Sequence, residues 1–196
     1  EGARTLDPPL LSPSAMSRSG SRLTGVSRVF SGIQPTGEVH LGNLLGALRN
    51  WVSDQDTHDC VYCVVDLHAL TVPQDPAVLG AKSLSLAQKL LAVGLDPALC
   101  TLFVQSHVPE HAELALLLGM ITPVGWLERV PTYKDLQQKL ADRDLSNYGF
   151  LGYPVSQAAD ITFCKAHLVP VGKDQAPHLE LTRKIVRRFN ELYAEV

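Results

Sequence analysis

Residues 30–43 carry a set of polar side chains that is well suited to binding an anion. They read Phe-Ser-Gly-Ile-Gln-Pro-Thr-Gly-Glu-Val-His-Leu-Gly-Asn, so an apolar strand, a loop and a helix start follow one another. The first amides of a helix have no acceptor within it and lie at the positive end of its dipole, so they attract anions. His40 and Asn43 lie about one turn apart and would face a bound phosphate. Gly42 would let a group approach the backbone closely.

This candidate anion site differs from two common nucleotide-binding motifs. No Gly-Lys-Ser/Thr follows the loop, as it would in a P-loop. The Gly-x-Gly-x-x-Gly pattern of dinucleotide-binding folds is also absent.

Polar residues also follow the second predicted strand and occupy one face of a later helix. Asp66 and His68 stand where a parallel sheet gathers its binding residues; a capping Asp and a loop His explain them about equally well. Tyr153, Gln157 and Asp160 lie three to four residues apart and share a helix face. A carboxylate in an apolar helix is costly unless paired. This face suits a small ligand with an N–H group, and the alternative is a structural salt bridge.

Residues 169–175, Val-Pro-Val-Gly-Lys-Asp-Gln, form another strand, glycine turn and helix start. Asp174 is expected either to cap the following helix or to face the ribose hydroxyls of a nucleotide held by the turn backbone.

Two further patterns look like metal sites but are interpreted otherwise. His107 and His111 are four residues apart, but Pro109 marks a helix start between them, so no zinc site is expected. Cys60 and Cys63 have C-x-x-C spacing. They lie in a β-branched and aromatic strand, where residues three apart point to opposite faces. We interpret the cysteines as buried free thiols in a reducing compartment, and we expect no metal site.

Composition limits the classes of protein to consider. The chain has 196 residues, 45% of them hydrophobic, and a net charge of −3. This suffices for one domain with a sizeable core. No apolar run is long enough to span a membrane, and a non-specific nucleic-acid binder with a basic surface is not favoured. Residues 1–27 are rich in Ser, Pro, Gly and Arg, and are expected to be disordered. They read as an organellar leader, an upstream read-through or an expression remnant.

Predicted strands and helices alternate along the chain. Hydrophobic periodicity predicts strands over 28–32, 61–66, 100–105 and 168–171, and helices over 40–53, 76–93, 110–121, 126–140, 154–163 and 174–194. Asp75 is expected to cap the second helix, which begins at Pro76. The alternation predicts an α/β fold with a mainly parallel sheet covered on both faces. Ligands would bind beyond the carboxyl ends of its strands, near the switch point.

Taken together and in order, the motifs resemble those of the bacterial and organellar tryptophanyl-tRNA synthetases, within the class I synthetases. The stretch from Phe30 to Asn43 is similar to their version of the HIGH signature, and Asp66-Leu-His-Ala-Leu-Thr to their second signature. Tyr153-Pro with Gln157-Ala-Ala-Asp is similar to the amino-acid pocket. Residues 170–175, with His178-Leu-Glu-Leu-Thr-Arg, are similar to the ribose and substrate loop. The resemblance runs from about residue 28 to the end.

This resemblance implies a Rossmann-type (HUP-like) catalytic domain over residues 28–196 that activates L-tryptophan with ATP and Mg²⁺ and transfers it to tRNA(Trp). The implied catalytic residues are His40, Asn43 and Lys134, the last reaching pyrophosphate. The implied ATP-binding residues are Gln34, Pro35, Thr36, Gly42, Asn43, Gly172, Lys173 and Asp174. The implied tryptophan-binding residues are Phe30, His68, Tyr153, Gln157, Asp160 and Gln175, with Asp160 accepting the indole N–H. The resemblance also implies a homodimer without membrane association, in the cytoplasm, or in mitochondria or plastids if residues 1–27 are a leader.

The chain departs from this family in two respects. Many members have Glu where Lys173 stands, although the backbone there could still hold the nucleotide. No Lys-Met-Ser-Lys-Ser signature appears, so the chain reads as the front part of an enzyme, without that loop and the helical anticodon-binding domain. We expect it to bind tryptophan weakly and not to charge tRNA at a useful rate. The alternatives are a tyrosine-specific relative and a ligand-binding fragment without ligase activity.

Overall fold

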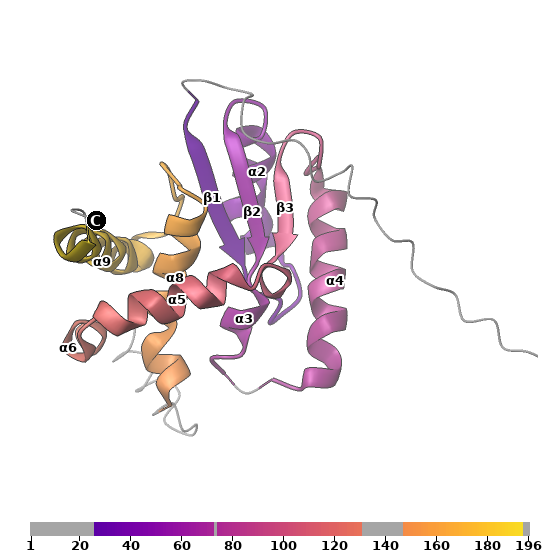
Figure 1. Ribbon diagram of the computed structural model, residues 1–196. Coiled ribbons are helices and arrows are strands. Elements are labelled where there is room, and N and C mark those ends of the chain that lie inside the picture. The colour runs from indigo at the N-terminus through magenta and orange to yellow at the C-terminus, as the bar shows by residue number, and fades with distance from the viewer. Residues whose placement is uncertain (1–25, 73, 131–146, 194–196) are drawn as a thin grey trace, which may run out of the picture.

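The computed structural model describes residues 26–72, 74–130 and 147–193. A parallel sheet has the order β1-β2-β3, with β1 (Arg28–Ile33), β2 (Asp59–Val64) and β3 (Thr101–Val104). The helical elements are α1 (Leu41–Asn43), the π-helical turn η2 (Leu44–Leu48), α2 (Arg49–Asp54), α3 (Asp66–Ala69), α4 (Pro76–Val93), η3 (Gln105–His107), α5 (Glu110–Ile121), α6 (Val124–Leu127), α8 (Tyr148–Phe163), η4 (Lys173–Gln175) and α9 (Ala176–Tyr193). Figure 1 shows α4 beside β3, with α8 and α9 beyond β1. The Rossmann-type α/β fold expected from the sequence is confirmed.

The chain changes direction across the sheet at β1. After β1 it adds β2 and β3 on one side, and later returns to the other edge of β1, where Leu168 forms a parallel bridge with Val29. The backbone N–H of Phe30 donates to the carbonyl of Leu168 at 3.0 Å. The space beyond the carboxyl end of β1 is therefore the switch point of the sheet, where such folds bind ligands.

The predicted strand over 168–171 was wrong in its extent, because only Leu168 pairs with the sheet. Pro170 has no N–H to donate to a ladder, so the pairing cannot continue regularly through it. Residues 59–64 replace the predicted 61–66 as the second strand, and Asp66 instead begins α3.

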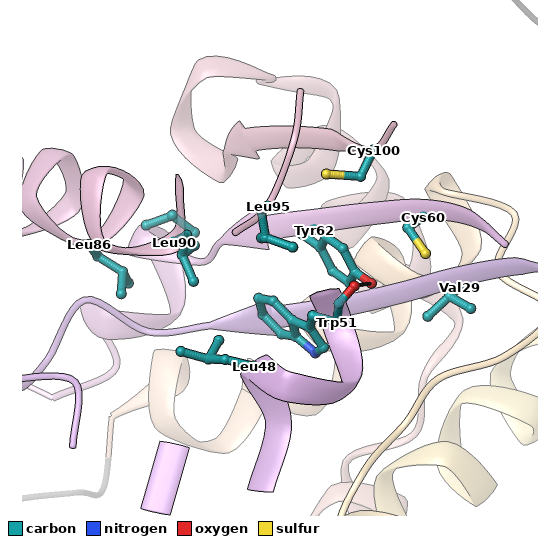
Figure 2. Close-up of a cluster of buried hydrophobic side chains, with 10 residues drawn as sticks. Val29, Leu48, Trp51, Cys60, Tyr62, Leu86, Leu90, Leu95 and Cys100 are labelled. Atoms are coloured by element: carbon teal, nitrogen blue, oxygen red, sulfur yellow. Dashed lines mark hydrogen bonds between the residues drawn. The ribbon is translucent and has the colours of Figure 1, made fainter. Parts of the chain in front are cut away.

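One face of the sheet packs against α2 and α4. Trp51 of α2 stacks on Tyr62 of β2, with ring centroids 4.5 Å apart and planes 9° from parallel. The Tyr62 hydroxyl donates to the Trp51 carbonyl at 2.9 Å, and burial raises the pKa of this phenol. Figure 2 shows this pair among the other buried side chains of the cluster, which include Leu86 and Leu90 of α4.

The other face of the sheet packs against α8. Phe30 and Cys63 lie in one apolar cluster with Ile161 and Cys164, whereas Cys60 belongs to the opposite cluster. Cys60 and Cys63 thus lie on opposite faces of the sheet, as the strand interpretation requires. All four cysteines are free and buried, which confirms the prediction of buried thiols. Burial raises the pKa of Cys164 to about 12 and that of Cys100 to about 11.

Two helices differ from their predicted ranges. α8 begins at Tyr148 rather than 154, because the Asn147 side chain accepts from the Phe150 N–H at 2.9 Å and caps an earlier start. Pro154 therefore lies inside the helix, where it removes one backbone hydrogen bond. The other predicted helix, over 126–140, can be compared only at residues 126–130, where α6 (Val124–Leu127) ends at Leu127.

Other local predictions are confirmed or lie outside the described residues. Asp75 caps α4 as predicted, accepting from the Ala77 N–H at 2.9 Å. Lys134 and the rest of the helix predicted over 126–140 fall in 131–146, outside the described residues. So does most of the segment 1–27, of which only Val26 and Ser27 are described.

Candidate active site

The first predicted site lies at the switch point, where α1 follows β1. His40 caps α1: its Nδ1 accepts from the Gly42 N–H at 3.1 Å, and its own N–H donates to Asn43 Oδ1 at 3.1 Å. Because Nδ1 accepts, the neutral ring carries its hydrogen on Nε2. Nε2 is therefore the ring atom that remains able to donate to a ligand. A Cβ at Gly42 would lie 2.9 Å from His40 Cε1, so glycine is needed for this ring position.

Two residues of the loop between β1 and α1 contact the rest of the protein. Pro35 is buried, while Gln34 and Thr36 are exposed. Glu38 forms an ion pair with Lys89 of α4, and this hydrogen-bonded lysine lowers the pKa of the Glu38 carboxyl. The loop thus presents two polar side chains to solvent from a backbone held by its neighbours.

A buried polar network centred on Asp160 lies where α8 meets the carboxyl end of the sheet. His68 Nε2 donates to Asp160 Oδ2 at 2.8 Å, and His111 Nδ1 donates to Oδ1 at 2.7 Å. Gln105 Nε2 lies 2.9 Å from Oδ1 and 2.8 Å from Oδ2. All four side chains are buried, with Asp160 only 1% exposed. We call these four residues the Asp160 network; it joins α8 to α3, η3 and α5.

The network keeps Asp160 ionised in spite of its burial. Burial raises the pKa of the carboxyl, but the hydrogen bonds from His111 and His68 lower it by more, with help from Gln105. The net pKa of Asp160 therefore lies below its ordinary value. The molecule thus holds a buried negative charge, oriented by three donors.

Asp66, which follows the second strand, bonds to the segment that follows the third. Its carboxylate accepts from the Ser106 N–H at 3.0 Å and from the Ser106 hydroxyl at 2.6 Å. These bonds tie the start of α3 to η3, which follows β3. Asp66 therefore positions the two segments that carry His68 and Gln105.

A second polar contact joins α8 to α9. The Tyr153 hydroxyl and His178 Nε2 are 3.0 Å apart. His178 is fully buried, and burial lowers the pKa of its ring. Preceding α9, Asp174 Oδ2 accepts from Gln175 Nε2 at 2.9 Å. A Cβ at Gly172 would lie 2.6 Å from Asp174 Oδ1, so glycine leaves room for this position of the Asp174 carboxylate.

The structure brings together only part of the predicted amino-acid pocket by direct contact. His68 and Asp160 are bonded, and Phe30 packs in the cluster that contains the next residue, Ile161. Gln157 is half-buried on α8, one turn before Asp160. Lys173 begins η4, adjoining Gly172 and Asp174.

Sequence reasoning missed Gln105 and His111 as members of the Asp160 network, and it placed His178 near the substrate loop without predicting its contact with Tyr153. Gln105 follows the last residue of β3. The rule that binding residues gather after the carboxyl ends of parallel strands, which was used for Asp66 and His68, therefore applied equally to Gln105. His111 was considered only as a zinc ligand. Within the described ranges, no group of three or more His, Cys, Asp and Glu side chains is arranged to hold a metal ion. None of the described helices is long and apolar enough to cross a membrane.

Comparisons with known proteins place this geometry in a family. The family model described as "tRNA synthetases class I (W and Y)" matches residues 22–196. A tryptophan–tRNA ligase from Ralstonia nicotianae is 56% identical over 167 residues, which are 85% of this chain and 42% of that protein. One from Gloeobacter violaceus is 54% identical over 172 residues, covering 88% of this chain and 51% of the relative.

Solved structures agree with these sequence relatives. The tryptophanyl-tRNA synthetase of Campylobacter jejuni, in complex with ADP and tryptophan, superposes with a TM-score of 0.78 at 39% identity, covering 84% of this chain and 50% of that one. The chain thus spans about half the length of the relatives it matches. On the family match and these identities, the chain belongs to the class I tRNA synthetases of the tryptophan and tyrosine family.

Proposed function

We propose that this chain forms the amino-acid and ATP site of a tryptophan–tRNA ligase. Support comes from relatives named tryptophan–tRNA ligase that are 56%, 54% and 52% identical to it. A tyrosyl-tRNA synthetase from Archaeoglobus fulgidus is only 21% identical and shares the fold. Tryptophan is therefore favoured over tyrosine as the substrate.

The observation that carries the proposal is the buried, ionised carboxylate of Asp160 at the carboxyl end of the sheet. Tryptophan has one side-chain donor, the indole N–H, in an otherwise apolar ring. A hydrogen bond to a charged acceptor in a buried site contributes about 1.5–3 kcal/mol. Asp160 would therefore select this ring, with Phe30, His68, Tyr153, Gln157 and Gln175 around the amino acid.

ATP would bind across the start of α1 and the turn before α9. His40 Nε2, Asn43 and the amides of α1 would hold phosphate oxygens, with Gln34, Pro35, Thr36 and Gly42 alongside. Gly172, Lys173 and Asp174 would line the adenosine, and Mg²⁺ would arrive bound to the ATP phosphates. The proposed role of Lys134, contact with pyrophosphate, falls outside the described residues.

The proposed reaction needs positioning more than covalent help from the protein. The carboxylate of tryptophan attacks the α-phosphorus of ATP, the bond to the bridging oxygen breaks, and pyrophosphate leaves. His40 and the helix amides would stabilise the charge that grows on the phosphate oxygens in the transition state. Transfer of the activated tryptophan to tRNA(Trp) would follow as the second step.

Calorimetric titration of the chain with L-tryptophan, and then with L-tyrosine, tests the proposal. We expect tryptophan to bind more tightly, and Asp160→Asn to weaken tryptophan binding by about tenfold or more while leaving ATP binding within twofold. Gln55→Met, which alters a buried glutamine bonded to Gly94 and Asp96, serves as the control and should change neither ligand's affinity. Equal affinity for tryptophan and tyrosine, or an unchanged tryptophan affinity in Asp160→Asn, would refute this assignment.

We also propose that the protein forms a homodimer through α5. Leu116, Leu117 and Met120 of this helix are 57%, 62% and 73% exposed, and adjoining apolar side chains of this size are commonly covered by a partner. Light scattering should give twice the monomer mass, and Leu117→Lys should halve it. A monomeric parent chain would disprove the dimer.

The cytoplasmic location remains a prediction from the sequence.

A further inference from the structure

The carboxylate of Asp160 has no acceptor site left for another donor. An ionised carboxylate accepts about four hydrogen bonds, two on each oxygen. Oδ1 already receives His111 Nδ1 and Gln105 Nε2, and Oδ2 receives His68 Nε2 and Gln105 Nε2. A ligand N–H can therefore bind Asp160 only if one of the present donors gives up its bond.

Gln105 is the donor that can give up a bond to Asp160 with the smallest loss of hydrogen bonding. His68 and His111 each make a single bond to the carboxylate, so either would lose its whole contact with it. Gln105 bonds both oxygens through one amide nitrogen and can release one while keeping the other.

The other contacts of Gln105 and His111 also indicate that Gln105 moves more easily. The Gln105 Oε1 atom is buried and has no hydrogen-bond partner among the described residues, so a turn of its carboxamide breaks no other bond there. The ring of His111, by contrast, packs near those of both Phe103 and Phe163, with centroids 5.3 Å and 4.4 Å away. His111 is therefore held in place by packing as well as by its hydrogen bond.

The geometry points to Gln105 as a specificity-determining residue that occupies the Asp160 acceptor site until a ligand N–H replaces it. This inference rests on the proposed binding of tryptophan at Asp160. Gln105 keeps the buried charge fully bonded in the empty site, so a ring without an N–H leaves Asp160 satisfied. The bond that tryptophan forms with Asp160 is partly offset by the bond that Gln105 gives up. Gln105 therefore reduces the preference of the site for tryptophan over rings of the same shape that lack the donor.

The test compares L-tryptophan with 3-(benzothiophen-3-yl)-L-alanine, in which sulfur replaces the ring N–H. Calorimetry gives the ratio of the two dissociation constants for the unsubstituted chain, for Gln105→Met and for Gln55→Met. Methionine has a similar shape and no N–H donor. Without the competing amide, the indole N–H meets an open acceptor, so we expect Gln105→Met to raise the preference for tryptophan about tenfold. The control Gln55→Met removes a buried glutamine on another part of the fold and should leave the ratio unchanged.

An unchanged or lower ratio in Gln105→Met would overturn the inference. A second measurement needs no variant: the side-chain amide signal of Gln105 in nuclear magnetic resonance should move on addition of tryptophan and stay in place with the sulfur analogue. Equal movement with both ligands, or with neither, would also overturn it. If the unsubstituted chain binds no tryptophan at all, the proposed function itself fails and this inference fails with it.

Discussion

Replacing Asp160 by alanine should be among the most destabilising single substitutions in this chain. The change removes the one acceptor shared by His68, Gln105 and His111, whose side chains are all buried. None of the three can turn to bulk water without opening the packing between α8 and its neighbours. The cost is therefore that of stranded buried donors, in addition to the loss of the bonds themselves.

The magnitude follows from the number and burial of these donors. A buried donor without an acceptor costs about 1–3 kcal/mol, and breaking a buried charged interaction by removing one partner costs about 3–5 kcal/mol. Since the donors share one acceptor, their costs do not simply add, and we expect a loss of about 3–5 kcal/mol. A typical domain has about 5–15 kcal/mol of stability in total. With a urea slope of about 2 kcal/mol/M, the unfolding midpoint should fall by about 2 M.

Urea unfolding followed by circular dichroism at pH 7 measures this loss, and Asp66→Ala is the matched control. Asp66 also accepts two bonds at the carboxyl end of the sheet, but its partner Ser106 is exposed and can bond water instead. We expect Asp66→Ala to cost about 1 kcal/mol. If Asp160→Ala cost no more than Asp66→Ala, the three buried donors of the Asp160 network would not depend on the Asp160 carboxylate as described.

Three further outcomes are expected. Tyr62→Phe should lower the free energy of unfolding in urea by about 1 kcal/mol, because it removes the buried bond to the Trp51 carbonyl but keeps the ring; no change would mean that water replaces this bond. His40→Ala should slow tryptophan-dependent pyrophosphate exchange by about 10²–10³-fold in a full-length enzyme with little effect on tryptophan affinity, whereas an equal loss of affinity would make His40 structural. Burial lowers the pKa of His178 below 6.5, so the unfolded chain binds this proton first and the free energy of unfolding should fall as the pH drops from 6.5 toward the folded pKa. Urea unfolding at several pH values should show that this fall is shallower in His178→Gln than in the unsubstituted chain, by at most about 1.4 kcal/mol per pH unit. Equal pH dependence of the two chains would contradict the pKa shift.

Local patterns in the sequence were enough to predict the class of fold. Alternating apolar strands and helical repeats indicated a parallel sheet, because each pattern reflects which faces of an element are buried. The cap at Asp75 and the opposite faces of Cys60 and Cys63 followed from geometry within a few residues. The same is true of the helix predicted to begin at residue 40, because His40 caps α1 there.

The contacts of Asp160 depend on how distant parts of the chain pack together. The sequence showed that a carboxylate in an apolar helix needs partners, because burying an unpaired charge is costly, but it left a ligand and a salt bridge as alternatives. The partners His68, Gln105 and His111 lie 92, 55 and 49 residues away along the chain. They meet Asp160 because β2 and β3 end at the same edge of the sheet, and because α5 packs across α8 at that edge. Such contacts depend on how whole elements pack, and no short-range pattern of residues records that packing.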